Sequence, residues 1–153
     1  SLKTGVMRTI KELYEKKVRQ FIVTSSSRIQ VETLTSNLFC GLNPFDFFVC
    51  SEDVIHHKPD PLPYNQAIKL SGIKKENSIV FEDSFPGLMS SLGAGLPTIC
   101  VETNIPIDFG DNHINCLVDS LGDEEHPTNF LVGSCFDSVF VDYKFLNNFL
   151  KNY

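Results

Sequence analysis

The sequence predicts an α/β protein with a doubly wound, mostly parallel sheet. Short runs of apolar residues alternate with longer segments of helical periodicity along most of the chain. Small polar or acidic residues follow several of these runs, as they do where the strands of a parallel sheet end. The 153 residues, 42% apolar and 21% charged, have the size and balance of one globular domain. Such an alternation favours right-handed crossovers, with helices covering both faces of the sheet.

The chain begins with a helix, a strand and a second helix. Apolar residues recur at helical spacing over residues 5–17 and predict an amphipathic helix. Residues 20–24 form a short segment rich in β-branched side chains, which predicts a strand that ends in a serine-rich loop. Ile29, Leu34 and Leu38 then indicate the next helix. This order is one strand-loop-helix unit.

Two further strands follow, with a helix between them. Residues 47–50 and 78–81 are short apolar runs of the kind that forms buried strands. Residues 62–70 are typical of a helix, and Gly72 closes it because glycine readily takes the left-handed conformation that ends helices. The unit of strand and helix is therefore repeated.

One more helix and strand complete the regular part of the sequence. Pro86 suits a first helical turn, Gly93 and Gly95 suit its end, and residues 98–101 predict a strand. Beyond this strand the pattern weakens into a loop-rich segment at about residues 102–135. The remaining expectations are a short strand at 115–118, an edge strand at 138–141 and a closing helix at 143–150.

Charge and cysteine content exclude several classes of partner and compartment. Thirteen Lys and Arg against 19 Asp and Glu give a net charge of −6, and no basic block interrupts the chain, so we expect no nucleic-acid or membrane partner. No apolar run approaches the ~20 residues that span a bilayer. The five cysteines never form C-x-x-C, which favours a reducing compartment. We expect a cytoplasmic protein, with the plastid stroma as the alternative because a leader could precede Ser1.

Three sets of polar residues follow three successive strands. A hydroxyl loop follows the first, a lysine with two stiffening prolines just after it follows the second, and two adjacent acids follow the third. Alone, each has an ordinary explanation: a helix N-cap, a solvated surface charge, and acids at a helix N-terminus. Together they predict a phosphoryl site, in which hydroxyl and N–H groups bind phosphoryl oxygens, the lysine neutralises charge and the carboxylates hold Mg²⁺. The residues are Thr24, Ser25, Ser26, Lys58, Glu82 and Asp83.

These stretches, IVTSSSR at 22–28, KPDP at 58–61 and FEDSFPGL at 81–88, resemble the second, third and fourth motifs of the haloacid dehalogenase superfamily. The likeness is to its β-phosphoglucomutase-like and CbbY-like phosphatase branch. It implies Mg²⁺-dependent phosphoryl transfer on a Rossmann-like core. Ser25 and Lys58 would be catalytic, Thr24, Ser25, Ser26 and Lys58 would bind phosphate, and Glu82 and Asp83 would bind the metal. Residues 1–150 would form a partial core domain.

Two longer stretches suggest a narrower likeness. KPDPLPY at 58–64 and LVDSLGD at 117–123 are similar to Calvin-cycle-associated phosphatases that act on pentulose bisphosphates. The resemblance therefore implies a small phosphorylated sugar as substrate. A sugar phosphomutase is the alternative within the same family.

One part of the family's pattern is missing. The family carries its nucleophile in an Asp-x-Asp motif at the end of a central first strand, and a cap domain follows; no two aspartates of this sequence have that spacing. We expect this chain to lack both parts, through truncation, through division into two chains or through genuine loss. It would then be inactive alone, prone to self-association, and completed by an N-terminal segment. A non-catalytic module that binds phosphate or Mg²⁺ is the alternative function.

Overall fold

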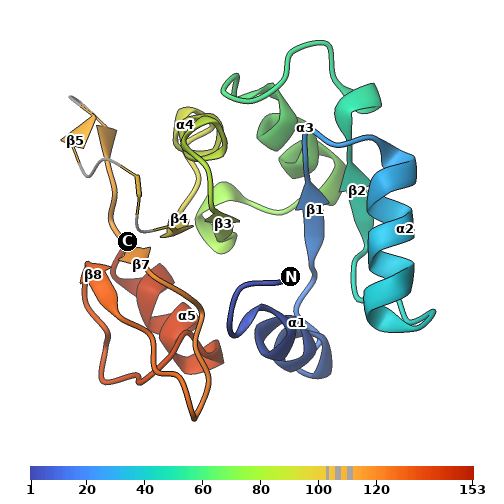
Figure 1. The fold of residues 1–153 in the computed structure, drawn as a ribbon. Helices are drawn as coiled ribbons and strands as arrows, with labels where there is room; N and C mark the ends of the chain where they lie inside the picture. Colours follow the sequence, from blue (N-terminus) through green and yellow to red (C-terminus); the bar gives the residue numbers. More distant parts are fainter. Residues whose placement is uncertain (103, 106–107, 110–111) are drawn as a thin grey trace.

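The computed structural model describes residues 1–102, 104–105, 108–109 and 112–153 and confirms the α/β class. Its strands form two separate parallel units and one short hairpin (Figure 1). β1 pairs only with β2, and a second sheet has the order β3-β4-β7-β8, in which β8 alone is antiparallel. The strands are β1 (Phe21–Val23), β2 (Phe47–Val49), β3 (Val80–Glu82), β4 (Thr98–Val101), β5 (Asp108–Phe109), β6 (Asn112–His113), β7 (Leu117–Val118) and β8 (Phe130–Val132).

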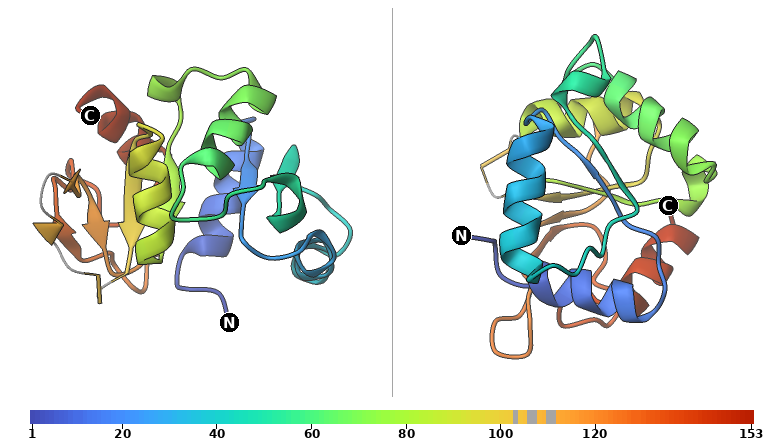
Figure 2. Two further views of the ribbon diagram at one scale, coloured as in Figure 1. Left: turned by 90° about the horizontal axis from the view of Figure 1, so that it is seen from above. Right: turned by 90° about the vertical axis from the view of Figure 1, so that its right-hand side faces the viewer.

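Helices cover both faces of the strands, as a doubly wound fold requires. α1 and α5 lie side by side below the four-stranded sheet, while α3 and α4 lie above the strands (Figure 2). α2 lies beside β2 at the outer edge (Figure 1). None of these helices, over the ranges that the structure describes, is both long and apolar enough to cross a membrane. The helices are α1 (Val6–Glu15), α2 (Arg28–Phe39), α3 (Leu62–Ser71), α4 (Phe85–Gly93) and α5 (Tyr143–Lys151), with short 3₁₀ turns at Ser51–Asp53 and Lys75–Asn77.

The core is centred on β4, whose four residues are all buried. Ile99 and Val101 pack into the cluster formed by α1 and α5, whereas Cys100 packs with Leu88 of α4 on the opposite face. Successive side chains of a strand point to opposite faces, so a strand covered on both sides is apolar throughout. The continuous apolar run at 98–101 therefore results from burial between two helical layers.

The predicted edge strand at 138–141 is wrong. Residues 138–141 are irregular, and the edge strand is β8, within the segment that the sequence presented as loop-rich. β8 has one face toward solvent, where Leu131 is 50% exposed, and an exposed edge strand needs little apolar signal. Its neighbour β7 lies within the predicted strand at 115–118, which is confirmed.

α2 was predicted correctly, but its buried face was not. Ile29 and Leu34 are 70% and 56% exposed. The helix instead buries Val31, Thr35 and Phe39, which recur every four residues and so share one face. Thr35 is buried at low cost because its hydroxyl donates to the Val31 carbonyl at 2.9 Å.

The five cysteines are all free thiols. Cys50, Cys100 and Cys116 are buried, whereas Cys40 and Cys135 are exposed. Burial raises the pKa of Cys100 to about 11 and that of Cys116 to about 12, so these two thiols are unreactive near neutral pH.

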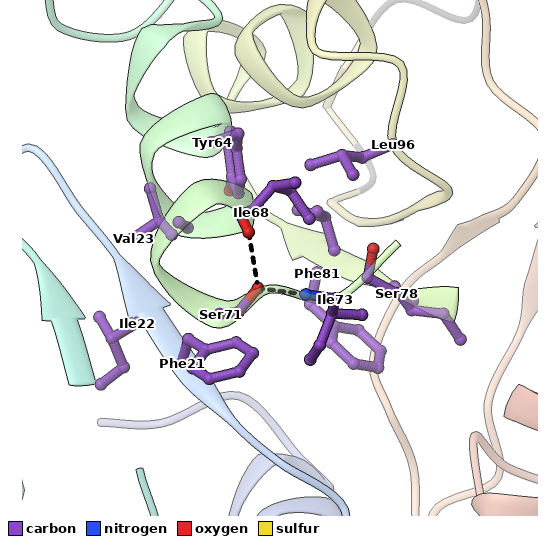
Figure 3. Close-up of a pocket in the computed structure, with 13 residues that line it drawn as sticks. Phe21, Ile22, Val23, Tyr64, Ile68, Ser71, Ile73, Ser78, Phe81 and Leu96 are labelled. Carbon is purple, nitrogen blue, oxygen red and sulfur yellow. Dashed lines mark hydrogen bonds between the residues drawn. The ribbon is translucent and has the colours of Figure 1, made fainter. Parts of the chain in front are cut away.

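A slot separates β1 from β3. The amide of Thr24 donates to the Val49 carbonyl of β2, and backbone groups alternate in direction along a strand, so the Val23 carbonyl faces the slot. On the α3 side the slot is a cavity of about 280 Å³, lined mostly by apolar side chains (Figure 3). On the α1 side a second cavity measures about 730 Å³, and Phe21 and Phe81 line both. Two strand edges therefore face each other across apolar space without pairing.

Candidate active site

The hydroxyl loop begins where β1 ends. The Ser26 amide donates to Thr24 Oγ1 at 3.1 Å, and the Ser27 amide donates to Gln30 Oε1 at 3.0 Å in a capping box of α2. Ser25 is exposed, and its hydroxyl has no hydrogen-bond partner among the residues that the structure describes. Thr24 and Ser27 therefore shape the loop, while the Ser25 hydroxyl is available to a ligand.

The N-terminus of α2 already holds an anion from the protein itself. The Glu52 carboxylate accepts the Arg28 amide with both oxygens, at 3.1 and 3.2 Å, and Asp53 pairs with the Arg28 guanidinium. Hydrogen bonds from the amides of Glu52 and Arg28 lower the pKa of Glu52. The Arg28 amide, at the start of this helix, is therefore already occupied by a carboxylate of the chain. The acids directly after β2 were the signal that sequence reasoning missed.

Lys58 spans the slot at the carboxyl ends of the strands. Its ammonium donates to the Val23 carbonyl of β1 at 2.9 Å and forms an ion pair with Glu82 of β3. Its side chain is only 12% exposed. The sequence predicted a loop lysine that binds a ligand, and the structure adds that it also connects the two strand units.

Glu82 accepts two donors at one oxygen. Lys58 and the Tyr64 hydroxyl both donate to Oε1 of this carboxylate, whose side chain is 6% exposed. Burial, followed by the charge of Glu82, raises the pKa of Tyr64 well above its usual value, so the phenol remains a neutral donor. A Cβ on Gly87, in the first turn of α4, would overlap the carboxylate. Tyr64 and Gly87 were not among the predicted site residues.

Asp83 is the acid that remains available to a cation. It is exposed, it lines the larger cavity, and its carboxylate has no partner within the described ranges. Mg²⁺ commonly takes one or two carboxylates together with waters and substrate oxygens, so Asp83 fits as a ligand. Oε1 of the neighbouring Glu82 is occupied by its two donors. No group of three or more His, Cys, Asp or Glu side chains that could hold a metal occurs in the part of the chain described.

The three predicted segments meet at one edge. Lys58 touches both Val23, which precedes the hydroxyl loop, and Glu82, which precedes Asp83. The site is thus an exposed hydroxyl, a partly buried cation and an exposed carboxylate arranged around the mouth of the slot. Such a set can bind an anion and a divalent cation together.

Comparison with known proteins gives one family. Residues 1–101 match the model of the haloacid dehalogenase-like hydrolases. The pyrophosphatase PpaX of Halalkalibacterium halodurans is 35% identical over 99 residues, which are 63% of this chain and 45% of that protein. Protein CbbY of Cereibacter sphaeroides is 30% identical over 101 residues, 65% of this chain and 44% of that protein.

The solved structure of CbbY from Rhodobacter sphaeroides in complex with phosphate is similar across the fold. The TM-score is 0.67 at 27% identity, and the match covers 78% of this chain and 54% of that chain. A mutant of the same protein was solved with xylulose-(1,5)bisphosphate. The chain spans about half the length of these relatives.

Proposed function

The chain belongs to the haloacid dehalogenase-like hydrolase family, and from this premise we propose that it forms the phosphate-binding and metal-binding part of a phosphatase. The observation that carries the proposal is Lys58, a partly buried cation held at the junction of the hydroxyl loop and the acidic pair. The ion pair with Glu82 compensates its charge and keeps the ammonium at this junction. We assign residues 1–150 to this partial core.

The proposed roles follow the contacts. The hydroxyls of Thr24, Ser25 and Ser26 bind phosphoryl oxygens, and Lys58 neutralises the charge that develops on them. Ser25 and Lys58 are therefore the proposed catalytic groups of this chain. Bound Mg²⁺ supplies further neutralisation of the phosphoryl charge, and we assign its ligands here to Asp83, with Glu82 beside it.

We further propose that the slot between β1 and β3 receives a parallel strand that carries the nucleophilic aspartate. Among the described residues neither edge pairs with a strand, the slot between them is lined mostly by apolar side chains, and the sequence holds no Asp-x-Asp of its own. Paired strands lie ~4.8 Å apart, and buried strand edges are costly when left without partners. The chain alone is therefore expected to be inactive and prone to self-association.

The proposed substrate is a small phosphorylated sugar, and more narrowly a pentulose bisphosphate. Support comes from the sugar bisphosphate bound in the CbbY structure and from the likeness of residues 58–64 and 117–123 to phosphatases of that class. The absence of an Asp-x-Asp from these 153 residues favours, as a second candidate, a module that binds phosphate or Mg²⁺ without catalysis. Free thiols at all five cysteines support a reducing, cytoplasmic location.

Phosphatase assays of two preparations test the proposal. One is the chain alone, and the other is the chain produced with an N-terminal segment that contains an Asp-x-Asp strand. We expect Mg²⁺-dependent hydrolysis of sugar phosphates only in the second. Asp83→Asn should abolish that activity, whereas Glu76→Gln, which changes an exposed acid outside the site, should not. Hydrolysis by the 153 residues alone would contradict the requirement for a strand, and phosphate binding without turnover in the completed protein would favour the binding module.

A further inference from the structure

Tyr64 is a buried phenol at the point where the two charged groups of the site meet. It lies in the first turn of α3 with 6% of its surface exposed. Its ring packs with Val80, Ala94 and Leu96 and lines the slot below the site (Figure 3). The ring is therefore held against the core formed by these side chains on one side and faces the cavity on the other.

The hydroxyl of that ring contacts both charges. It donates to Glu82, and Lys58 Nζ lies 3.4 Å from it as a donor. The same ammonium lies 5.0 Å from the centre of the ring, within reach of a cation–π attraction. A phenol can donate one hydrogen bond and accept another, so these contacts close a triangle of three side chains.

A lysine needs such a constraint if its charge is to occupy one place. The side chain has four flexible carbons and a compact charge, whereas a phenol has two rotatable bonds and a rigid ring. Glu82 alone restrains the ammonium through one oxygen. The added phenol and the Val23 carbonyl define its position in three directions.

We propose that Tyr64 is a positioning residue, which holds the Lys58 ammonium at the mouth of the slot where the phosphoryl group binds. The proposal rests on the proposed function for the role of Lys58, but the position of the ammonium can be tested without it. KPDPLPY contains Tyr64, yet nothing in the sequence shows that its hydroxyl reaches Glu82 of a different strand.

The test compares Tyr64→Phe with Tyr14→Phe in the full chain. Phe keeps the buried ring and removes one oxygen, while Tyr14→Phe removes the same atom from a 40% exposed phenol of α1. The first measurement is the acylation rate of Lys58 by a water-soluble amine reagent, read by peptide mass spectrometry under native conditions. We expect Tyr64→Phe to increase that rate about tenfold at an unchanged melting temperature, and Tyr14→Phe to leave it unchanged.

Glu82→Gln separates the two restraints on the ammonium. Labelling that accelerates in Glu82→Gln but stays at the wild-type rate in Tyr64→Phe would overturn the proposal, because the carboxylate would then be the sole restraint. If Tyr64→Phe lowers the melting temperature by more than ten degrees, the phenol is part of the fold and the positioning role is likewise overturned.

The second measurement is the dissociation constant for inorganic phosphate by calorimetry. Tyr64→Phe should raise it about tenfold and Tyr14→Phe should not change it. A wild-type chain that binds no phosphate would contradict the proposed function while the labelling result still decides the role of Tyr64.

Discussion

The four-stranded sheet and the β1–β2 pair are both built from very short strands, yet they are buried to different extents. All four residues of β4 are buried between helices, whereas the three residues of β1 are each only partly buried. The reason is that β4 has paired neighbours on both sides and β1 has one. Stability is therefore concentrated in one unit, and the site lies where that unit faces the other.

The same contrast explains where the polar side chains can be placed. The four-stranded sheet excludes water from its apolar clusters. The slot beside it leaves backbone groups of β1 and β3 and the walls of the cavity accessible to a further strand. Lys58 is the side chain that joins the units through Val23 and Glu82. Regions of low local stability are where loops and binding elements are usually found.

Truncation of one aromatic residue in each unit should give the largest difference in the loss of unfolding free energy. Phe145 of α5 has no exposed surface and packs against the rings of Phe130, Phe136 and Phe149, so Phe145→Ala should cost about 3–5 kcal/mol of unfolding free energy. Phe21→Ala, in half-buried β1, should cost about 1 kcal/mol. Urea denaturation measures both, and equal losses would show that the two units are equally well packed.

Loss of the Lys58–Glu82 ion pair, which connects the two units, should have the next largest effect on the free energy of unfolding. Lys58→Met keeps the length of the side chain but leaves a buried carboxylate without its cation, at a cost of about 3 kcal/mol. Lys11→Met on the exposed face of α1 is the control, with an effect within about 0.5 kcal/mol. A stable Lys58→Met protein would mean that the ion pair contributes nothing to holding the units together.

Two glycines of α4 provide a matched pair. Gly87→Ala should cost about 1–3 kcal/mol because the added methyl group overlaps the Glu82 carboxylate. At Gly93 the nearest atom to a new Cβ is a Pro61 carbon at 3.5 Å, which is ordinary contact, so Gly93→Ala should be neutral or gain up to about 1 kcal/mol from helix propensity. Thermal unfolding of both variants measures the difference. Similar shifts in melting temperature would argue against a rigidly held Glu82 carboxylate.

The smallest expected effect depends on pH and lies wholly within the four-stranded unit. Burial alone would raise the pKa of Asp119, which follows β7, but hydrogen bonds from Asn129 and Ser120 outweigh it and lower the pKa. A lowered pKa stabilises the fold above the unfolded value of ~3.9, and this contribution is lost as pH falls through the folded value. Asp119→Asn should therefore cost about 1 kcal/mol at pH 7. Its stability should converge with that of the wild type as pH falls below the unfolded pKa of ~3.9, and a constant difference would exclude this linkage.

Much of the fold was predictable because it depends on neighbours in sequence. The sequence located each helix that the structure describes, and Pro86 and Gly93 marked the first turn and the last residue of α4. The order of strand and helix was enough for the α/β class. The hydroxyl loop, Lys58 and the acidic pair were likewise recognisable, because each lies at or after the end of a strand predicted from sequence.

Contacts between distant segments decided the rest. No local pattern shows that β8 forms the edge, that α2 buries Val31 in place of Ile29, or that Glu52 caps the helix that starts at Arg28. The link between Lys58, Tyr64 and Glu82 joins a loop, a helix and a strand. Sequence by itself determined which residue types stand at each strand end. Only the tertiary structure decided which of them touch, because burial and hydrogen bonding depend on what packs against a residue from elsewhere in the chain.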